Sequence, residues 1–280
     1  MPVRIAHFSD LHLCPELGTD FQIEVVLALI EDAKRRKCDH FVFTGDFVDY
    51  ANLDDLSRLY RVFRQAGLKA TNTTIIPGNH DIFPIPGWGL SAIEIAKRTL
   101  TMLRGNAQGN YESFIRRSRF VLKGTTPIWH NESFPFIRKL SKDVLLVGVD
   151  STNDHWTGRL QFSKGSFDPQ DAEAILETLH SKPYANCQRR ILAIHHLPIE
   201  LKDFRSLEFK DVEFVQNFIV EAGFDLVLCG HVHFFGQMQI GQAMVVCSGC
   251  HFCRDQSLDT IGYSLINLGR SIRVEHFFAE

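Results

Sequence analysis

Aspartate, asparagine and histidine residues recur at the ends of short apolar runs in this sequence of 280 residues. The apolar runs span 3–8, 40–44, 73–76, 144–149, 190–194 and 226–229. Runs of β-branched, aliphatic or aromatic residues that end in Gly, Pro or polar residues are typical of buried strands. One such aspartate or histidine alone is usually a helix cap or a structural residue. Their joint recurrence predicts a site outside the carboxyl ends of the strands, where open α/β sheets bind ligands.

The types and spacing of these residues are typical of metal ligands. Asp10 and His12 are two residues apart, as are His231 and His233, so in extended chain each pair shares a face. Asp46 follows a glycine, which lets the backbone approach closely. A carboxylate in that place can bridge two cations and neutralise the charge that would keep them apart.

An asparagine and a further histidine complete the set. Asn79 offers a neutral oxygen and His195 an imidazole nitrogen. Mixed nitrogen and oxygen ligands suit Mn, Fe or Zn rather than Ca or Mg alone. Seven ligands are too many for one tetrahedral site and suit two divalent metal ions with one shared ligand. The predicted ligands are Asp10, His12, Asp46, Asn79, His195, His231 and His233.

Helical patterns separate most of the predicted strands. Apolar residues recur at helix spacing over 21–36, 53–65, 168–179 and 212–222. This alternation of strands and helices predicts an α/β fold, and the length suits a single domain over residues 1–280. Residues 237–280 alternate apolar and polar residues with turns at Gly241 and Gly269, which predicts antiparallel strands that finish a sheet.

Residues 87–140 interrupt the alternation. The stretch contains helical patterns over 91–103 and 111–119 and is too long for a plain loop. We expect it to be a helical cap or lid inserted into the domain.

Composition excludes several classes of protein. The formal net charge is −3 and the pI is near 6.5, so there is no excess of basic residues that would indicate nucleic-acid binding. No segment is long and apolar enough for a membrane span, and the first residues are typical of a strand rather than a signal peptide. The seven cysteines are an odd number over a long chain, which favours reduced thiols. We therefore expect a cytoplasmic protein, and leave its oligomeric state open, with a homodimer as one alternative.

The order of the motifs resembles the calcineurin-like metallophosphoesterase superfamily from Met1 to roughly Ser248. The motifs are Asp10-Leu11-His12, Gly45-Asp46, Gly78-Asn79-His80-Asp81, His195-His196 and Gly230-His231-Val232-His233. The resemblance implies a four-layer α/β/β/α sandwich of two mixed sheets. It also implies one metal ion held by Asp10, His12, Asp46 and His233, and a second held by Asp46, Asn79, His195 and His231.

The resemblance also implies a mechanism. Two metal ions clamp the phosphoryl oxygens and lower the pKa of a bound water, so that hydroxide attacks phosphorus in line with the leaving group. His80 is placed near the leaving oxygen, where an imidazolium donates a proton or stabilises charge. Asp81 either orients His80 as part of the catalytic set or caps the following chain. Because the family places the ligand directly after the strand, His195 is taken as the ligand and His196 as a substrate contact or a support.

The substrate class follows from what the second and third motifs contain. Protein Ser/Thr phosphatases of the superfamily carry an Arg-Gly after the second motif and a Glu after the Asn-His pair, whereas this chain has no Arg over 45–50 and has Asp81. The pattern is more similar to the bacterial class III branch of phosphodiesterases. We therefore expect a hydrolase of small phosphodiesters such as cyclic nucleotides or glycerophosphodiesters, with Mn or Fe as the most fitting metals and Zn as an alternative.

Three alternatives stay open. The first motif, within 7–13, also fits a DNA exonuclease or endonuclease, but only Arg116, Arg117, Arg119 and Lys123 would track phosphates. A phosphomonoesterase and a non-catalytic scaffold are the others, although a scaffold is expected to have lost ligands. Whether the segment with Cys247, Cys250 and Cys253 binds metal is also open, because zinc ribbons need two such halves.

Overall fold

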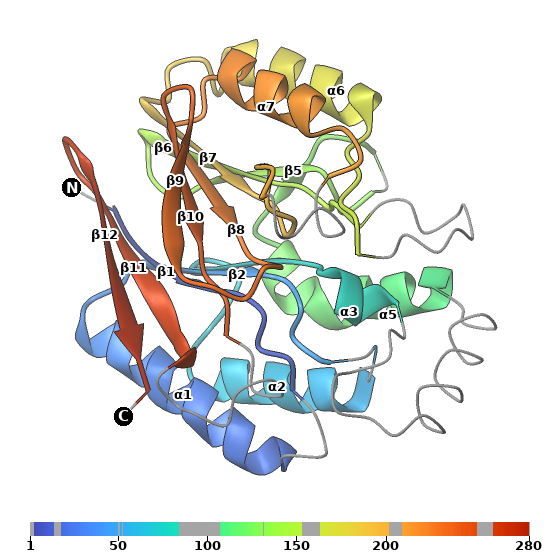
Figure 1. Ribbon diagram of the computed structural model, residues 1–280, viewed down its shortest axis with the longest axis vertical. Coiled ribbons are helices and arrows are strands. Elements are labelled where there is room, and N and C mark those ends of the chain that lie inside the picture. Colours follow the sequence, from blue (N-terminus) through green and yellow to red (C-terminus); the bar gives the residue numbers. More distant parts are fainter. Residues whose placement is uncertain are drawn as a thin grey trace.

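The computed structural model describes residues 3–13, 18–49, 51, 53–83, 107–130, 132–152, 163–201, 209–250 and 260–279. The chain folds into two β-sheets that are covered by helices on their outer faces (Figure 1). Strand and helix alternate through most of the sequence, as the apolar patterns predict.

The first sheet has five strands in the order β12-β11-β1-β2-β3. β1 (Val3–Phe8), β2 (His40–Thr44) and β3 (Thr73–Ile76) run parallel to one another. β11 (Gly262–Leu268) pairs antiparallel with β1, and β12 (Ile272–Phe278) pairs antiparallel with β11. The sheet is therefore mixed, and β12 forms one of its edges.

The second sheet has seven strands in the order β4-β5-β6-β7-β8-β10-β9. β6, β7, β8 and β10 are parallel, whereas β5 pairs antiparallel with β6 and β9 with β10. The strands are β4 (Thr126–Pro127), β5 (Phe136–Lys139), β6 (Val144–Gly148), β7 (Arg189–Ala193), β8 (Leu226–Cys229), β9 (Gly236–Ile240) and β10 (Ala243–Cys247).

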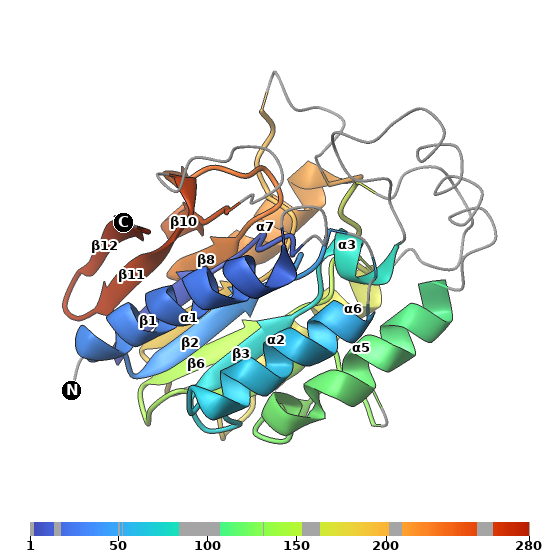
Figure 2. The same ribbon diagram turned by 90° about the horizontal axis from the view of Figure 1, so that it is seen from below.

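Six helices lie on the described part of the chain. α1, α2 and α5 lie side by side over the five-stranded sheet (Figure 2), whereas α6 and α7 cover the seven-stranded sheet (Figure 1). The helices are α1 (Thr19–Arg35), α2 (Leu53–Gln65), the short α3 (Asn79–Ile82), α5 (Ala107–Leu122), α6 (Pro169–His180) and α7 (Val212–Glu221).

Three apolar cores separate these layers. Alternate strand residues point to opposite faces, so Ile5 of β1 packs between the sheets while Phe8 packs against α1 and α2. In the same way, Leu146 of β6 packs between the sheets and Leu145 packs under α6 and α7. The result is the four-layer α/β/β/α sandwich of two mixed sheets that the resemblance implies.

The predicted elements agree closely with the structure. The six predicted strands correspond to β1, β2, β3, β6, β7 and β8 to within one residue, and the four helices to within two. The C-terminal strands differ from the prediction in one respect, because they finish both sheets instead of one. β9 and β10 extend the seven-stranded sheet, whereas β11 and β12 extend the five-stranded one.

Within the range 87–140, the structure describes residues 107–130 and 132–140. There α5 packs against α2 and α3, with Phe114 buried in the core over the five-stranded sheet, and β5 is a strand of the other sheet. These residues therefore belong to the layers of the fold. The predicted helix over 91–103 lies outside the described residues, and the predicted cap or lid over 87–140 stays a prediction.

No helix within the described ranges combines the length and hydropathy that crossing a membrane requires.

Candidate metal centre

The loops that follow β1, β2 and β8 carry most of the predicted ligands, and they share an unusual backbone conformation. Asp10, His12, Asp46, His231 and His233 all have positive φ angles, between 41° and 73°. Positive φ is uncommon outside glycine, although Asp and His adopt it more readily than most residues. Within the described ranges, only one further non-glycine residue does so, Lys37 after α1. Local strain of this kind is concentrated at functional sites.

Two glycines let the loops after β2 and β3 touch. A Cβ atom on Gly78 would collide with the backbone nitrogen and carboxylate of Asp46, and one on Gly45 would collide with the backbone of Gly78. Gly45 also has a φ of 91°. The close approach places Asp46 beside Asn79, and the Asp46 Oδ1 atom accepts a hydrogen bond from the backbone N–H of His80 at 2.8 Å.

The structure brings the side chains of the first predicted ligand set close together. One potential ligand atom from each of Asp10, His12, Asp46 and His233 lies within 4.8 Å of the others. The Nε2 atoms of His12 and His233 are 3.0 Å apart, and the His12 Nε2 atom is 3.5 Å from Asp46 Oδ2. Asp10 Oδ1 lies 3.5 Å from His233 Nε2. These separations leave room for one cation in contact with all four side chains.

Two further predicted ligands, His195 and Asn79, lie close to Asp46. The His195 Nε2 atom lies 3.2 Å from Asp46 Oδ2 and 3.0 Å from Asn79 Oδ1. Asp46 Oδ2 is thus shared between His12 and His195. It is buried and accepts no hydrogen bond within the described chain, so its charge is balanced either by protonated His12 and His195 or by a bound cation.

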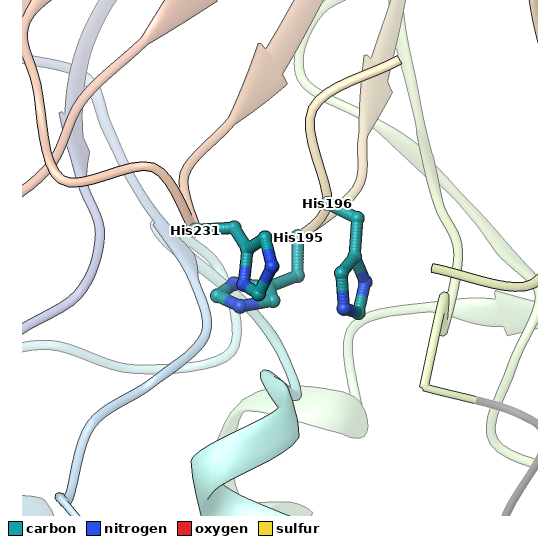
Figure 3. Close-up of side chains that lie close together, drawn as sticks. All are labelled: His195, His196 and His231. Atoms are coloured by element: carbon teal, nitrogen blue, oxygen red, sulfur yellow. The ribbon is translucent and has the colours of Figure 1, made fainter. Parts of the chain in front are cut away.

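Three imidazoles gather where β7 and β8 end, as Figure 3 shows. The ring centroid of His231 is 5.1 Å from that of His195 and 4.4 Å from that of His196. His196 turns its Nδ1 atom to Ser151 Oγ at 2.7 Å, and its buried Nε2 atom has no hydrogen-bond partner among the residues that the structure describes. The structure therefore brings His195 to Asp46 and Asn79, while His196 stands beside His231.

Backbone carbonyls fix which imidazole nitrogen is available. His195 Nδ1–H donates to the carbonyl oxygen of Thr44 at 2.6 Å, and His231 Nε2–H donates to that of Ser163 at 2.8 Å. In the neutral ring, each bond leaves the other ring nitrogen with a lone pair. Metal-ligating histidines are generally oriented by such bonds, so this pair has the tautomers that ligands need.

The electrostatics of the site favour bound positive charge. Burial opposes a charge on His12, but the carboxylates of Asp10, Asp49 and Asp46 outweigh it and raise its pKa to about 10. Burial also opposes a charge on His195, yet Asp46 raises its pKa to about 9. The carboxylates thus attract protons onto imidazoles in the absence of another cation. A divalent cation would satisfy the same carboxylates.

His231 and His196 behave in the opposite way. Burial and the neighbouring His195 lower the pKa of His231 to about 3. Burial and the imidazoles of His231 and His195 hold the pKa of His196 well below its ordinary value. Both rings are therefore neutral near pH 7 and keep a lone pair.

His80 and Asp81 have different surroundings. The His80 ring lies edge-on to that of His12, 4.7 Å away, and its Nδ1–H donates to the carbonyl oxygen of Asp49 at 2.5 Å. The Asp81 carboxylate instead accepts the backbone N–H groups of Asp46, Phe47 and Gly78, each at 2.9 Å. These bonds tie Asp81 to the loops after β2 and β3, whereas the His80 ring is held by the Asp49 carbonyl. A catalytic role for Asp81 stays a prediction.

Two residues at the site were not predicted from the sequence. The Asp49 Oδ1 atom lies 3.5 Å from His12 Nδ1, and Ser151 holds His196. Asp49 follows β2 three residues after Asp46, and Ser151 follows the end of β6, so a polar residue after a strand is the one signal that could have indicated them. Cys247 and Cys250 are buried and bond to backbone carbonyls of Gly230 and Gly262; Cys253 lies outside the described residues.

The fold is similar to several solved structures at low sequence identity. A dimetal phosphatase from Danio rerio matches with a TM-score of 0.62 and 10% identity, over 100% of this chain and 97% of that chain. A purple acid phosphatase from yellow lupin seeds (Lupinus luteus) matches with a TM-score of 0.59 and 13% identity, over 99% of this chain and 52% of that chain.

A third similar structure is described as the anchor in the inner membrane complex of Plasmodium. Its TM-score is 0.57 at 13% identity, over 99% of this chain and 84% of that chain. At such identities the likeness concerns the fold alone. No curated protein sequence matches the chain.

The family is decided by the sequence model that the chain matches. The model for calcineurin-like phosphoesterases matches residues 3–235, a span that runs from β1 to the loop after β8 and includes every candidate ligand. Membership of this family implies a phosphoric ester hydrolase with a dinuclear metal centre, and the structure clusters Asp and His side chains that could hold metal ions. The chain belongs to the calcineurin-like phosphoesterase family.

Proposed function

We propose that this protein is a phosphodiesterase that hydrolyses small diesters with two divalent cations, Mn or Fe. Asp10, His12, Asp46 and His233 would hold one cation, and Asp46, Asn79, His195 and His231 the other. The observation that carries the proposal is the shared oxygen of Asp46. Its Oδ2 atom is buried without a hydrogen-bond partner in the described chain, 3.5 Å from His12 Nε2 and 3.2 Å from His195 Nε2.

The metals would supply the Lewis acidity that activates water and stabilises charge on the phosphoryl oxygens. The protein's own residues supply orientation and proton transfer. His80 donates Nδ1–H to the Asp49 carbonyl oxygen, so Nε2 is the atom that holds and delivers a proton to the leaving oxygen. Burial lowers the pKa of His80, which makes its imidazolium a stronger acid.

His196 is the proposed substrate contact. Its Nδ1 atom is held by Ser151 Oγ, which keeps Nε2 free to bond a substrate oxygen. Ser151 also accepts the backbone N–H of His196 at 3.3 Å, so ring and backbone are fixed by one hydroxyl.

Support for a diester over a monoester comes from the sequence motifs. The chain has no Arg over 45–50 and has Asp81 where protein Ser/Thr phosphatases of the superfamily carry a Glu, a pattern more similar to the class III branch of phosphodiesterases.

The nuclease alternative draws no support from the basic residues of α5. Arg116 donates to Ser113 Oγ at 2.8 Å and Arg117 donates to Ser57 Oγ of α2 at 2.7 Å. These guanidinium groups are engaged on the helical layer, so they are not arranged as a phosphate-tracking surface.

The test compares hydrolysis of bis(p-nitrophenyl) phosphate with that of p-nitrophenyl phosphate. The protein is stripped of metal, then supplied with Mn(II) or Fe(II), with Asp46→Ala and His80→Ala beside the wild type. We expect metal-restored activity on the diester, lost in Asp46→Ala and strongly reduced in His80→Ala. A strong preference for the monoester would indicate a phosphatase, and inactivity with every metal would favour a scaffold.

A further inference from the structure

A chain of buried hydrogen bonds runs between the two sheets, next to the candidate metal centre. His7 Nε2 lies 2.8 Å from Thr44 Oγ1, and His7 Nδ1 lies 3.0 Å from Ser248 Oγ. Ser248 continues the chain to Ser264 Oγ of β11 at 2.5 Å, and Ser264 continues it to His276 Nδ1 of β12 at 2.9 Å. His7, Thr44, Ser248 and Ser264 are all fully buried.

His7 occupies a place where an aliphatic residue would be expected. Its neighbours on the same face of β1 are Val3 and Ile5, which pack in the apolar core between the sheets. A polar ring in this place costs free energy unless it is hydrogen-bonded, and here both nitrogens have hydroxyl partners. The ring therefore makes two hydrogen bonds that a valine or isoleucine could not make.

At its Thr44 end, this series of hydrogen bonds lies next to two candidate ligands. Thr44 is the last residue of β2, directly before Gly45 and Asp46. Its carbonyl oxygen accepts His195 Nδ1–H at 2.6 Å and the hydroxyl of Ser9 at 3.2 Å. Thr44 thus holds a ligand of the seven-stranded sheet from the end of a strand in the five-stranded sheet.

The Ser248 end reaches the loop that carries His233. Ser248 follows β10, and the next residue, Gly249, packs so tightly on that loop that a Cβ atom would lie 2.6 Å from His233 Cα. The imidazole of His7 therefore joins one residue beside Asp46 and His195 to another beside His233. These two places belong to different sheets.

We propose that His7 is a positioning residue of the metal centre, which fixes the separation of the two sheets at their ligand-bearing edge through Thr44 and Ser248. Candidate ligands come from both sheets, so the distance between the sheets decides whether His195 and His233 meet Asp46 and Asp10. Groups that orient metal ligands commonly contribute 10- to 100-fold in metal affinity. The inference rests on the proposed two-metal function.

The chain offers a matched control for a plain core histidine. His40 Nε2 lies 2.8 Å from Thr74 Oγ1, also buried and also between neighbouring strands. His40 begins β2, whereas the candidate ligands follow the ends of the strands. A buried histidine–threonine pair remote from the strand ends that carry the ligands is thus present in the same sheet at the same distance.

The experiment titrates Mn(II) into the metal-free protein by calorimetry, for wild type, His7→Leu and His40→Leu. We expect two sites in the wild type, an affinity about 10- to 100-fold lower in His7→Leu, and wild-type affinity in His40→Leu. A His7→Leu protein that binds both Mn ions within about twofold of the wild type would overturn the inference while leaving the proposed function intact. A wild type that binds no Mn(II) would overturn the proposed function itself.

Thr44→Val and Thr74→Val form a second pair, in case the larger change prevents folding. Each replaces a hydroxyl with a methyl group and keeps the backbone carbonyl. We expect Thr44→Val to weaken Mn(II) binding and Thr74→Val to leave it unchanged, and equal affinities in the two variants would contradict the role of Thr44. His7→Gln, whose amide can reach Thr44, is expected to recover part of the affinity that His7→Leu loses.

Discussion

At the scale of single residues, the site is defined by backbone as much as by side chains. The left-handed conformation at Asp10, His12, Asp46, His231 and His233 turns each chain sharply as it leaves a strand. Such conformations cost of order 1–3 kcal/mol each for residues with a Cβ atom. The surrounding contacts must supply that free energy, and the hydrogen bonds of the Asp81 carboxylate to the loops after β2 and β3 are one source.

Asp46→Asn tests the shared oxygen without changing its size. We expect metal content to fall from two ions per chain to one or none, because a neutral amide cannot offset two cations. Metal analysis after dialysis measures this directly. Asp143→Asn, a change at a half-exposed carboxylate, is the control and is expected to keep both ions. Two tightly held ions in Asp46→Asn would contradict the bridging role.

Gly78→Ala tests the close approach of two loops. The added methyl group would collide with the Asp46 carboxylate and backbone, so we expect the loop to shift and activity to fall by about 100-fold or more. Gly269→Ala is the matched change, since its nearest heavy atom would be 3.7 Å away. Steady-state kinetics on the same diester compares them, and equal activity in both variants would exclude a positional role for Gly78.

The sequence reveals the ligands more readily than their supports. Asp10, His12 and His231 announce themselves by type and by place after a strand. Asp81 is also visible in its motif, but its contacts are not, because its partners Asp46 and Phe47 lie 34 to 35 residues away in the sequence and follow no spacing pattern. A carboxylate that binds backbone N–H groups looks the same in the sequence as one that orients a catalytic ring.

At the scale of elements, periodicity predicts the strands and helices well, but it does not predict which elements pack against one another. The buried runs that became β1, β2 and β3 are short, rich in β-branched and aromatic residues and bounded by polar residues, which leaves little ambiguity. The helix α5 was equally visible, yet its apolar face could have met a lid or the main core. In the structure, Phe114 packs in the core and α5 contacts α2. The spacing of apolar residues over 107–122 does not predict this packing.

Phe114→Ala tests whether α5 is part of the folded core. Phe114 is fully buried beside Phe47, so truncation is expected to lower the free energy of unfolding by about 3–5 kcal/mol. Phe21→Ala removes a side chain that is 52% exposed and is expected to change it by about 0.5 kcal/mol or less. Urea unfolding distinguishes them. Equal, small losses would mean that α5 detaches without unfolding the rest.

At the scale of the whole molecule, the C-terminal strands show the limit of local patterns. Residues 236–247 and 262–278 both read as hairpins, but one joins the seven-stranded sheet and the other joins the five-stranded sheet. The choice is made by pairing with β8 and β1, which lie far away in the sequence. The hydrogen bond between His7 and Ser248, which are 241 residues apart, cannot be predicted from local sequence patterns for the same reason.

Buried neutral histidines give the fold a predictable response to acid. Burial and the nearby Arg138 lower the pKa of His40 from 6.5 to about 3. Between these values the unfolded chain binds a proton that the folded protein does not. The stability due to neutral His40 is therefore complete above pH 6.5 and is lost as the pH falls toward 3.

His40→Gln tests this response, because glutamine can still bond Thr74 but does not titrate. We expect the free energy of unfolding to fall less steeply between pH 6 and pH 4, by up to about 1.4 kcal/mol per pH unit. Urea unfolding of metal-free protein at several pH values measures the slope. His180→Gln, at an exposed position, serves as the reference, and identical slopes for all three proteins would contradict the assignment.

The division of the candidate ligands between two sheets has a consequence for how the protein comes apart. His12 and His233 are 221 residues apart in the chain, yet their Nε2 atoms are 3.0 Å from each other. A cation between them would be a cross-link that closes a loop of most of the chain, and loop closure removes entropy from the unfolded state. It would also have to be released before the sheets separate, which lengthens the lifetime of the native state. Metal-bound protein is thus expected to resist proteolysis far longer than the same protein in a chelator. The metal centre would then stabilise the fold as well as take part in the reaction.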